Sequence, residues 1–371
     1  MNITCSRKDL IEALDAISKI VPNKPQTPIL SGVYMKAEGS ALELQTNNFE
    51  IGMKIKIPVN TEKPGVIVVN ARYLLEIVRK LSGEVVNIFH DEEKHTVNIK
   101  SDTADFNLLS MSAEDYPTVK SPETFAKFSL RASVLKNLIR KTAYACSDDM
   151  DSKPIFTGCY LKLEGNTVSM VATNTHRLAV MKETVSENTE DLSVVIPSKT
   201  VTELIRLLDT SNPSNTVSIE CSKKNISFTF ENMYITSRLI DGEFPPYEKV
   251  IPKSSDTIAT IKVAEMKNPI ERISLIAKET ENKNIQFIFS QEGINISAYS
   301  PDIGRAEEKI NAKIEGPDLT ISFNYSYMTD VLKVLDSKEF VMKLTKPLSP
   351  ADIREIDNDN FIYIMTPVRT Y

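Results

Sequence analysis

The chain has 371 residues, of which 41% are hydrophobic and 25% charged, the composition of an ordinary globular protein. Its formal net charge is −6, so bulk charge gives no indication of a nucleic-acid partner. No apolar run approaches the roughly 18 residues of a membrane-spanning helix, and the N-terminus lacks the apolar stretch of a signal peptide. We therefore expect a cytoplasmic protein with no membrane contact.

The cysteines and glycines give no indication of a cofactor. None of the four cysteines forms a Cys-x-x-Cys pair, so neither a zinc site nor a disulfide framework is predicted. Only 11 residues are glycine, and neither dinucleotide-binding nor phosphate-cradling glycine motifs occur. We expect no cofactor, no metal and a reducing compartment.

A short strand followed by an amphipathic helix is predicted six times along the chain. One pattern occupies residues 3–20, 128–145 and 259–276, and a second occupies residues 66–81, 193–208 and 320–335. Each copy of the second pattern begins 127 residues after the one before. Pro269 should kink the fifth helix or lie in its first turn. A spacing this long indicates a repeated domain, because solenoid units span some 20–50 residues.

Segments of alternating polar and apolar residues predict antiparallel hairpins at 32–46, 85–102, 216–230 and 284–300. The expected fold class is α+β, with three repeated domains, each of two helices packed on antiparallel sheets. Polar, proline-containing stretches near 121–127 and 252–257 suit linkers. We place the domains at 1–124, 125–254 and 255–371.

Positive charge gathers on the predicted helices. The six strand–helix segments together carry a net charge of +8, which leaves −14 on the rest of the chain. Basic helices in an acidic chain suit a phosphate backbone held without sequence readout. The chain has no tryptophan and no zinc finger, so reading of base edges is not indicated.

Four further motifs carry a resemblance over the whole chain: NKPQTPIL (23–30), VATNTHRLAV (171–180), DGEFPPYEKVIP (241–252) and YIMTPVRTY (363–371). With them, the chain resembles the β subunit of bacterial DNA polymerase III, the replication sliding clamp. The resemblance implies a non-catalytic, head-to-tail homodimer, each chain forming half of a closed ring around duplex DNA. Implied partners are the replicative polymerase α subunit, the clamp loader, and other polymerases and repair proteins that bind through short linear motifs.

Simple geometry agrees with a ring of two chains. Twelve helices about 9 Å apart make a circle of about 34 Å across their axes. Subtracting one helix diameter of roughly 10 Å leaves a hole of about 24 Å. By the same estimate the six helices of one chain would leave about 7 Å, too little for a duplex.

Two sets of contact residues are expected outside the partner pocket, and the resemblance implies the second of them. Basic side chains expected to face DNA are Lys24, Arg72, Arg79, Lys153 and Lys199, of which Lys24, Lys153 and Lys199 match basic positions of the family. The residues expected in the dimer interface are Phe106 in the first domain and Leu275 and Ile276 in the third. Edge strands near 103–110 and 297–304 could pair across this interface.

The resemblance also implies a peptide-binding pocket at the junction of the second and third domains. Its expected residues are Phe156, Thr173, Thr175, His176, Arg177, Leu178, Pro245, Val250, Leu348, Ile364, Met365, Thr366, Pro367, Val368 and Arg369. The apolar members would form walls, and His176 and Arg177 would donate hydrogen bonds. The chain departs from the family pattern where Thr175 replaces glycine, where Thr366 replaces an apolar residue, and where Thr370 and Tyr371 extend the end.

Two other classes of function stay open from the residues alone. One is a hydrolase centred on His176, with Arg177 and Asp241 beside it. The other is a repeat scaffold that binds no DNA, against which the basic helices argue. His90 and His95, the other two histidines, lie in a charged turn and are expected to be solvated.

Overall fold

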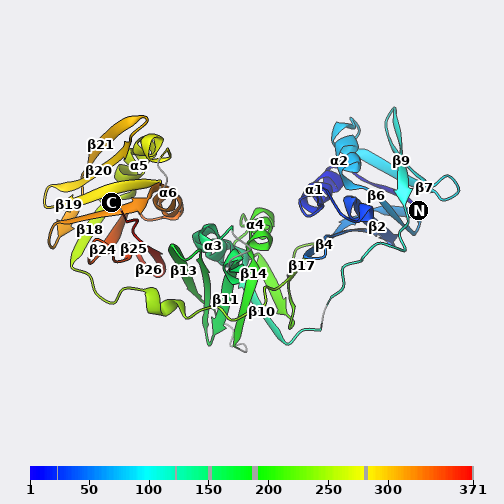
Figure 1. Cartoon of the computed structure of the whole chain (residues 1–371). Coiled ribbons are helices and arrows are strands. Elements are labelled where there is room, and N and C mark those ends of the chain that lie inside the picture. The colour runs from blue at the N-terminus through cyan, green and yellow to red at the C-terminus, as the bar shows by residue number, and fades with distance from the viewer. Residues whose placement is uncertain (23, 122, 149–152, 186–190, 280–282, 370–371) are drawn as a thin grey trace. The chain divides into compact units, whose positions relative to one another are not determined.

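The structure, a computed structural model, describes residues 1–22, 24–121, 123–148, 153–185, 191–279 and 283–369. The chain forms two compact units, and each is described by itself. Unit 1 contains Met1–Ser133 and Glu203–Leu239, and unit 2 contains Val134–Thr202 and Ile240–Tyr371. Figure 1 shows both units as helices packed on antiparallel sheets.

The six predicted helices are all present within the described residues, each directly after a strand. They are α1 (Arg7–Ser18), α2 (Ala71–Lys80), α3 (Ala132–Thr142), α4 (Ser198–Leu207), α5 (Val263–Ala277) and α6 (Tyr325–Val334). Polar side chains start several of them: Asn70 accepts from the Tyr73 N–H at 3.1 Å, and Asn324 from the Ser326 N–H at 2.9 Å. Pro269 lies in the interior of α5 rather than in its first turn.

Unit 1 contains one thirteen-stranded sheet. In spatial order its strands are β10 (Ala126–Arg131), β15 (Thr216–Cys221), β16 (Asn225–Phe230), β17 (Met233–Arg238), β4 (Ile51–Pro58), β3 (Ala41–Asn47), β2 (Gly32–Glu38), β6 (Gly65–Asn70), β9 (Ala104–Met111), β8 (Thr96–Ser101), β7 (Val85–Asp91), β1 (Asn2–Ser6) and β5 (Asn60–Lys63). The hairpins predicted at 32–46, 85–102 and 216–230 are confirmed by β2–β3, β7–β8 and β15–β16.

Unit 2 contains two sheets. The nine-stranded sheet has the order β14 (Leu192–Pro197), β11 (Gly158–Glu164), β12 (Thr167–Thr173), β13 (Arg177–Thr184), β26 (Asn358–Met365), β25 (Ala351–Glu355), β24 (Glu339–Leu344), β18 (Thr257–Lys262) and β22 (Lys313–Glu315). The four-stranded sheet has the order β21 (Gly304–Ile310), β20 (Gly293–Ser300), β19 (Asn284–Ser290) and β23 (Leu319–Asn324). The hairpin predicted at 284–300 is β19–β20.

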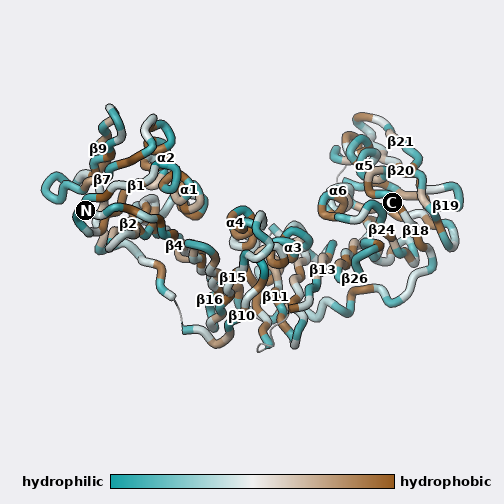
Figure 2. Tube along the Cα trace, turned by 180° about the vertical axis from the view of Figure 1, so that it is seen from behind, coloured by the Kyte–Doolittle hydropathy of each residue, from teal (hydrophilic) through white to brown (hydrophobic). Residues whose placement is uncertain are grey.

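Burial alternates along the strands, because successive side chains point to opposite faces of a sheet. In β10, for example, every second residue is buried. In Figure 2 hydrophobic residues run along the strands and along one side of the helices, while many of the turns are hydrophilic. The predicted α+β class, with antiparallel sheets and helices on them, is confirmed.

The sheets also show how consecutive repeats join. In unit 1, β4 of the first repeat pairs with β17 of the second, and Met53 faces Ile235. In unit 2, β13 of the second repeat pairs with β26 of the third, and Ala179 faces Tyr363. Each junction therefore joins the fourth strand of one repeat's sheet to the last strand of the next repeat.

The third repeat's counterpart of β4 and β13 is β21, which lies at the edge of its sheet. We predicted an edge strand near 297–304, and this assignment was wrong. Most of that segment belongs to β20, which is flanked by β19 and β21, so its backbone groups are already paired. The free edge lies one strand further along the chain, at Gly304–Ile310.

Candidate functional site

A groove in unit 2 brings together most of the predicted peptide-binding residues. Its volume is about 310 Å³, and its lining is mainly apolar. The lining residues are Phe156, Thr173, Thr175, His176, Arg177, Leu178, Phe244, Pro245, Pro246, Tyr247, Val250, Pro350, Ile364 and Thr366. They come from β12, β13, β26, two short helical turns (Pro154–Thr157 and Tyr247–Val250) and the segments beside them.

One wall of the groove is the loop between β12 and β13, which Asn174 organises. Its side-chain oxygen accepts from the N–H groups of His176 and Arg177, each at 3.1 Å. Thr175 at the tip has a φ of 76°, a left-handed conformation that is strained for a β-branched residue. Thr175 replaces glycine in the family pattern, so the sequence departs from that pattern at a position where the backbone favours glycine.

The end of the chain is held against the same loop. Both the N–H and the hydroxyl of Thr366 donate to the carbonyl oxygen of His176 at 2.9 Å. Further on, the Val368 N–H donates to the Ser322 carbonyl oxygen at 2.8 Å. The terminal segment therefore continues the β13–β26 pairing and closes one side of the groove. Thr370 and Tyr371 lie outside the described residues.

The floor of the groove is buried and apolar. Phe156, Leu178, Phe244, Tyr247 and Ile364 are all at most 8% exposed and belong to one buried cluster. The ring of Phe244 lies 5.9 Å from that of Phe156, edge to face. A preformed apolar floor of this kind favours burial of hydrophobic side chains from a bound segment.

Arg177 lines the groove but its guanidinium is already engaged. Its Nη1 donates to Asp330 Oδ2 at 2.6 Å, and Nη2 donates to the carbonyl oxygen of Tyr144. The guanidinium carbon also lies 4.6 Å from the centre of the Tyr327 ring, within cation–π range. Both terminal nitrogens of Arg177 are therefore engaged within the protein, while its buried Nε has no hydrogen-bond partner among the described residues. Donation from Arg177 to a bound peptide stays a prediction.

Ten of the fifteen predicted groove residues line the groove. The other five do not line it. Leu348 lies outside the groove and is 63% exposed, and Met365 is buried in the sheet. The remaining three follow Thr366 along the chain: Pro367, Val368 and Arg369. Four lining residues were missed: Phe244, Pro246, Tyr247 and Pro350. Three of these belong to the FPPY string at 244–247, whose run of aromatic and proline residues was the available signal.

The predicted DNA-facing cations are all exposed: Lys24, Arg72, Arg79, Lys153 and Lys199. Two of them have carboxylate partners, since Arg72 Nε lies 3.1 Å from Glu76 and Arg79 pairs with Asp15. Lys153 lines a second, polar cavity of about 630 Å³, to which Thr175, His176 and Arg177 also contribute. Lys199 lies in the first turn of α4.

The predicted interface residues are accessible for contact. Phe106 on β9 is 41% exposed, Leu275 on α5 is 60% exposed, and Ile276 is half-buried. β9 is not an edge strand, as we had expected near 103–110, because it lies between β6 and β8. Its pairing with β6 is confined to Ser110 and Met111, so Phe106 is paired on one side only, with Ile99 of β8. Exposed large apolar side chains are typical of a surface that another chain covers.

The hydrolase alternative finds no support at His176. Asp241 does not line the groove with His176 and Arg177, and the guanidinium of Arg177 is bound to Asp330. Among the described residues no three histidine, cysteine, aspartate or glutamate side chains are placed to hold a metal ion, and no helix could cross a membrane. All four cysteines are buried and free: Cys5, Cys146, Cys159 and Cys221.

Comparison with known proteins gives matches along the whole chain. The models of the DNA polymerase III beta subunit match in order: the N-terminal domain at residues 1–120, the central domain at 129–246 and the C-terminal domain at 248–369. The beta sliding clamp of Bacillus subtilis is 34% identical over 100% of both chains, and its crystal structure superposes with a TM-score of 0.95. A sliding clamp from Pseudomonas aeruginosa, bound to griselimycin, is 29% identical with a TM-score of 0.94 over 100% of both chains.

Proposed function

The chain belongs to the DNA polymerase III beta subunit family, the non-catalytic sliding clamps of DNA replication, and we propose that two copies form a closed ring around duplex DNA in the cytoplasm. The ring would tether the replicative polymerase and recruit the clamp loader and other polymerases and repair proteins. The observation that supports the dimer is the pairing of strands between consecutive repeats. This pairing occurs twice within the chain, as β4–β17 and β13–β26, and the corresponding pair of β21 with β9 would form between two copies of the chain.

Rows of residues that face one another on successive strands support the proposal that the missing junction lies at Phe106. In the second repeat, the residues that face one another across successive strands form a row that starts at Phe128 and ends at Ile235. The corresponding row of the third repeat starts at Ala259 and ends at Tyr363. In the first repeat the row from Ile3 ends at Phe106. Ile235 and Tyr363 are 2% and 0% exposed because a neighbouring repeat covers them, whereas Phe106 is 41% exposed.

The same comparison supports β21 as the strand that faces Phe106. Rows from Val68, Val195 and Ser322, which are 127 residues apart, end at Lys54, Val180 and Glu307. Ala306 is therefore the counterpart of Met53 and Ala179, the residues that face Ile235 and Tyr363. We infer that Ala306 on β21 of one copy faces Phe106 on β9 of the other, head to tail.

Release from linear DNA tests the ring. The clamp is loaded by its loader on nicked circular DNA, and the DNA is then cut once. A topological ring slides off the new ends, so we expect the bound fraction to fall to background after cutting. Retention on linear DNA at the level found on circular DNA would refute the ring.

The groove of unit 2 is proposed as the docking site for short linear segments of partner proteins. Its apolar floor and the polar groups of the His176 loop suit an extended peptide with apolar anchors. Deleting residues 367–371 removes the segment that follows Thr366, so we expect loss of binding to a peptide from the polymerase α subunit while the dimer stays intact in sedimentation. Unchanged peptide affinity after this deletion would contradict the assignment.

A further inference from the structure

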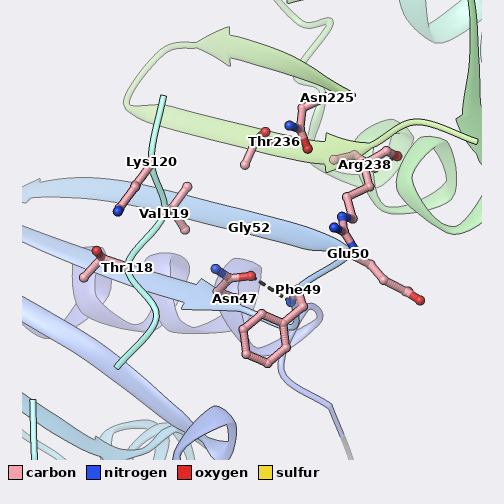
Figure 3. Close-up of a pocket in the computed structure, with 11 residues that line it drawn as sticks. Asn47, Phe49, Glu50, Gly52, Thr118, Val119, Lys120, Asn225, Thr236 and Arg238 are labelled. Carbon is pink, nitrogen blue, oxygen red and sulfur yellow. Dashed lines mark hydrogen bonds between the residues drawn. The ribbon is translucent and has the colours of Figure 1, made fainter. Parts of the chain in front are cut away.

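A third cavity, in unit 1, occupies the place of the peptide groove one repeat earlier. Its volume is about 470 Å³. It is lined by Asn47, Phe49, Glu50, Gly52, Thr118, Val119, Lys120, Asn225, Thr236, Ser237 and Arg238. Figure 3 shows the segment that carries Thr118, Val119 and Lys120 passing over the strand of Gly52, with Thr236 on a neighbouring strand.

The hairpin loops at the two sites have the same construction. Asn48 accepts from the N–H groups of Glu50 and Ile51 at 3.0 and 2.8 Å, as Asn174 does from His176 and Arg177. Phe49 at the tip has a φ of 68°, matching the left-handed Thr175. The Phe49 N–H donates to Asn47 Oδ1 at 2.8 Å (Figure 3).

The next repeat closes both sites in the same way. The Arg238 N–H donates to the Glu50 carbonyl oxygen at 2.8 Å, just as the Thr366 N–H donates to that of His176. The linker wall is also fixed: the Val119 N–H donates to Gln45 Oε1 at 3.0 Å, and Asn47 Nδ2 donates to the Pro117 carbonyl oxygen at 3.0 Å. A fixed wall reduces the entropy lost when a segment binds.

The chemistry of the two sites differs. At corresponding positions, the apolar Leu178 and Ile364 of the first groove become Gly52 and Thr236, and Thr366 becomes Arg238. Lys120 adds a second cation. Within the part of the chain that the structure describes, neither the Lys120 ammonium nor the Arg238 guanidinium has a carboxylate or hydrogen-bond partner.

We propose that this cavity is a second docking site, which takes an extended peptide segment bearing an acidic side chain from a partner protein. An acidic side chain would bind to Lys120 or to Arg238, which lie at opposite ends of the cavity in Figure 3, through charge-assisted hydrogen bonds. Glu50, which also lines the cavity, lies beside Arg238, so Lys120 is the cation further from a carboxylate. An adjacent apolar side chain would pack on Phe49, which is 55% exposed. Strand ends and a linker form the site and no helix contributes, so a peptide fits it better than the nucleic acid expected at the helices.

The proposal rests on the peptide-binding function proposed for the groove of unit 2, and a peptide array separates the two. Fluorescently labelled full chain is applied to an array of random hexapeptides as wild type, K120Q/R238Q and the 367–371 deletion. A control variant, K80Q/R131Q, removes one exposed lysine and one exposed arginine elsewhere in unit 1. Equal thermal melting of the substituted proteins checks that they are folded.

We expect a set of peptides enriched in aspartate and glutamate whose signal falls at least about tenfold in K120Q/R238Q. The same set should stay bound by the control and by the deletion variant. Absence of an acid-enriched set would overturn the proposal, and so would its equal loss in K80Q/R131Q, which would indicate non-specific attraction. Loss of the set only on deletion of residues 367–371 would assign it to the first groove.

A labelled oligothymidylate tests the nucleic-acid reading of the same cavity. K120Q/R238Q should leave the affinity for this oligonucleotide within about twofold of wild type. If the double substitution weakens the oligonucleotide and leaves every peptide unchanged, the cavity is a nucleic-acid contact and the peptide proposal fails. If the peptides that depend on residues 367–371 persist in either case, the function proposed for the first groove stands.

Discussion

Arg177 and Asp330 form an ion pair of 2.6 Å between Nη1 and Oδ2, although they lie 153 residues apart in the chain. The side chain of Arg177 is only 9% exposed, while that of Asp330 is 32% exposed. The pair joins the first residue of β13 to α6, and it sets the position of the loop that forms one wall of the groove. A side chain outside the groove thereby helps to hold the groove's shape.

Replacing Asp330 by alanine should destabilise unit 2 and weaken peptide binding. The substitution leaves a mostly buried guanidinium with one fewer partner, which costs about 1–3 kcal/mol. We expect the melting temperature to fall by at least about 2 °C and peptide affinity to fall with it. Calorimetry and fluorescence polarisation measure the two effects.

The exposed pair of Arg72 and Glu76 is the matched control. Glu76→Ala removes an ion pair between side chains that are 82% and 50% exposed, so its expected effect is at most about 0.5 kcal/mol. If Asp330→Ala and Glu76→Ala prove equally mild, Arg177 does not support the groove.

Local patterns in the sequence were sufficient to predict the six strand–helix units and four hairpins. Apolar spacing of two or four residues reports directly on a strand or helix face, and both features depend on neighbours in the chain. Most of the groove was found by resemblance, since the VATNTHRLAV string supplies one wall and the terminal segment another. The domain boundaries at 124 and 254 remain a prediction.

Features that depend on distant pairing were not predictable. Nothing local to Arg177 indicates that its guanidinium binds Asp330 rather than a ligand. The edge strand was placed one strand too early because alternation predicts strands but not which of them remains unpaired. The positive φ of Thr175 was likewise hidden, because threonine is an unusual residue at such a position.

The register proposed for the dimer predicts a specific cross-link. Directly opposed residues of an antiparallel pair have Cβ atoms about 4.5–5.5 Å apart, close to the range of a disulfide. Phe106→Cys combined with Ala306→Cys should therefore give a covalent dimer under mild oxidation, seen on a non-reducing gel. The native cysteines are buried and should not interfere.

Two controls make this cross-link decisive. Each single substitution should stay monomeric on the same gel, because its cysteine then lacks a partner. Phe106→Cys with Gly304→Cys shifts the register by two residues and should cross-link far less. Efficient cross-linking of the shifted pair, with none of the predicted pair, would overturn the register while leaving a dimer possible through another one.

Thr175→Gly should stabilise the protein slightly. Glycine removes a left-handed strain of about 1–2 kcal/mol but adds about 0.5–1 kcal/mol of chain entropy in the unfolded state. We expect a rise in melting temperature of up to about 3 °C. Thr173→Gly is the control: it removes the hydroxyl that donates to the Arg177 carbonyl oxygen at 2.6 Å, so it should lower the melting temperature. A fall with both substitutions would show that Thr175 is not strained.

Native thiols should react very slowly with a disulfide reagent. Burial raises the pKa of Cys5 and of Cys221 to about 12, and an interaction with Cys146 together with burial raises the pKa of Cys159 well above its usual value. At pH 8 a thiol of pKa about 12 is ionised in roughly one molecule in ten thousand, and only the thiolate reacts. We expect labelling of Cys5, Cys159 and Cys221, followed residue by residue by mass spectrometry, to be undetectable over minutes in native buffer and complete in denaturant.

An exposed cysteine provides the internal standard for this measurement. The side chain of Lys94 is 78% exposed, so Lys94→Cys should add one thiol that reacts within minutes at pH 8.

Because the folded pKa of Cys221 is raised, the stability that the Cys221 thiol contributes is present below about pH 9 and is lost as the pH rises towards 12. Rapid native labelling of wild type, at the rate of the Lys94→Cys thiol, would contradict the buried placement of the cysteines.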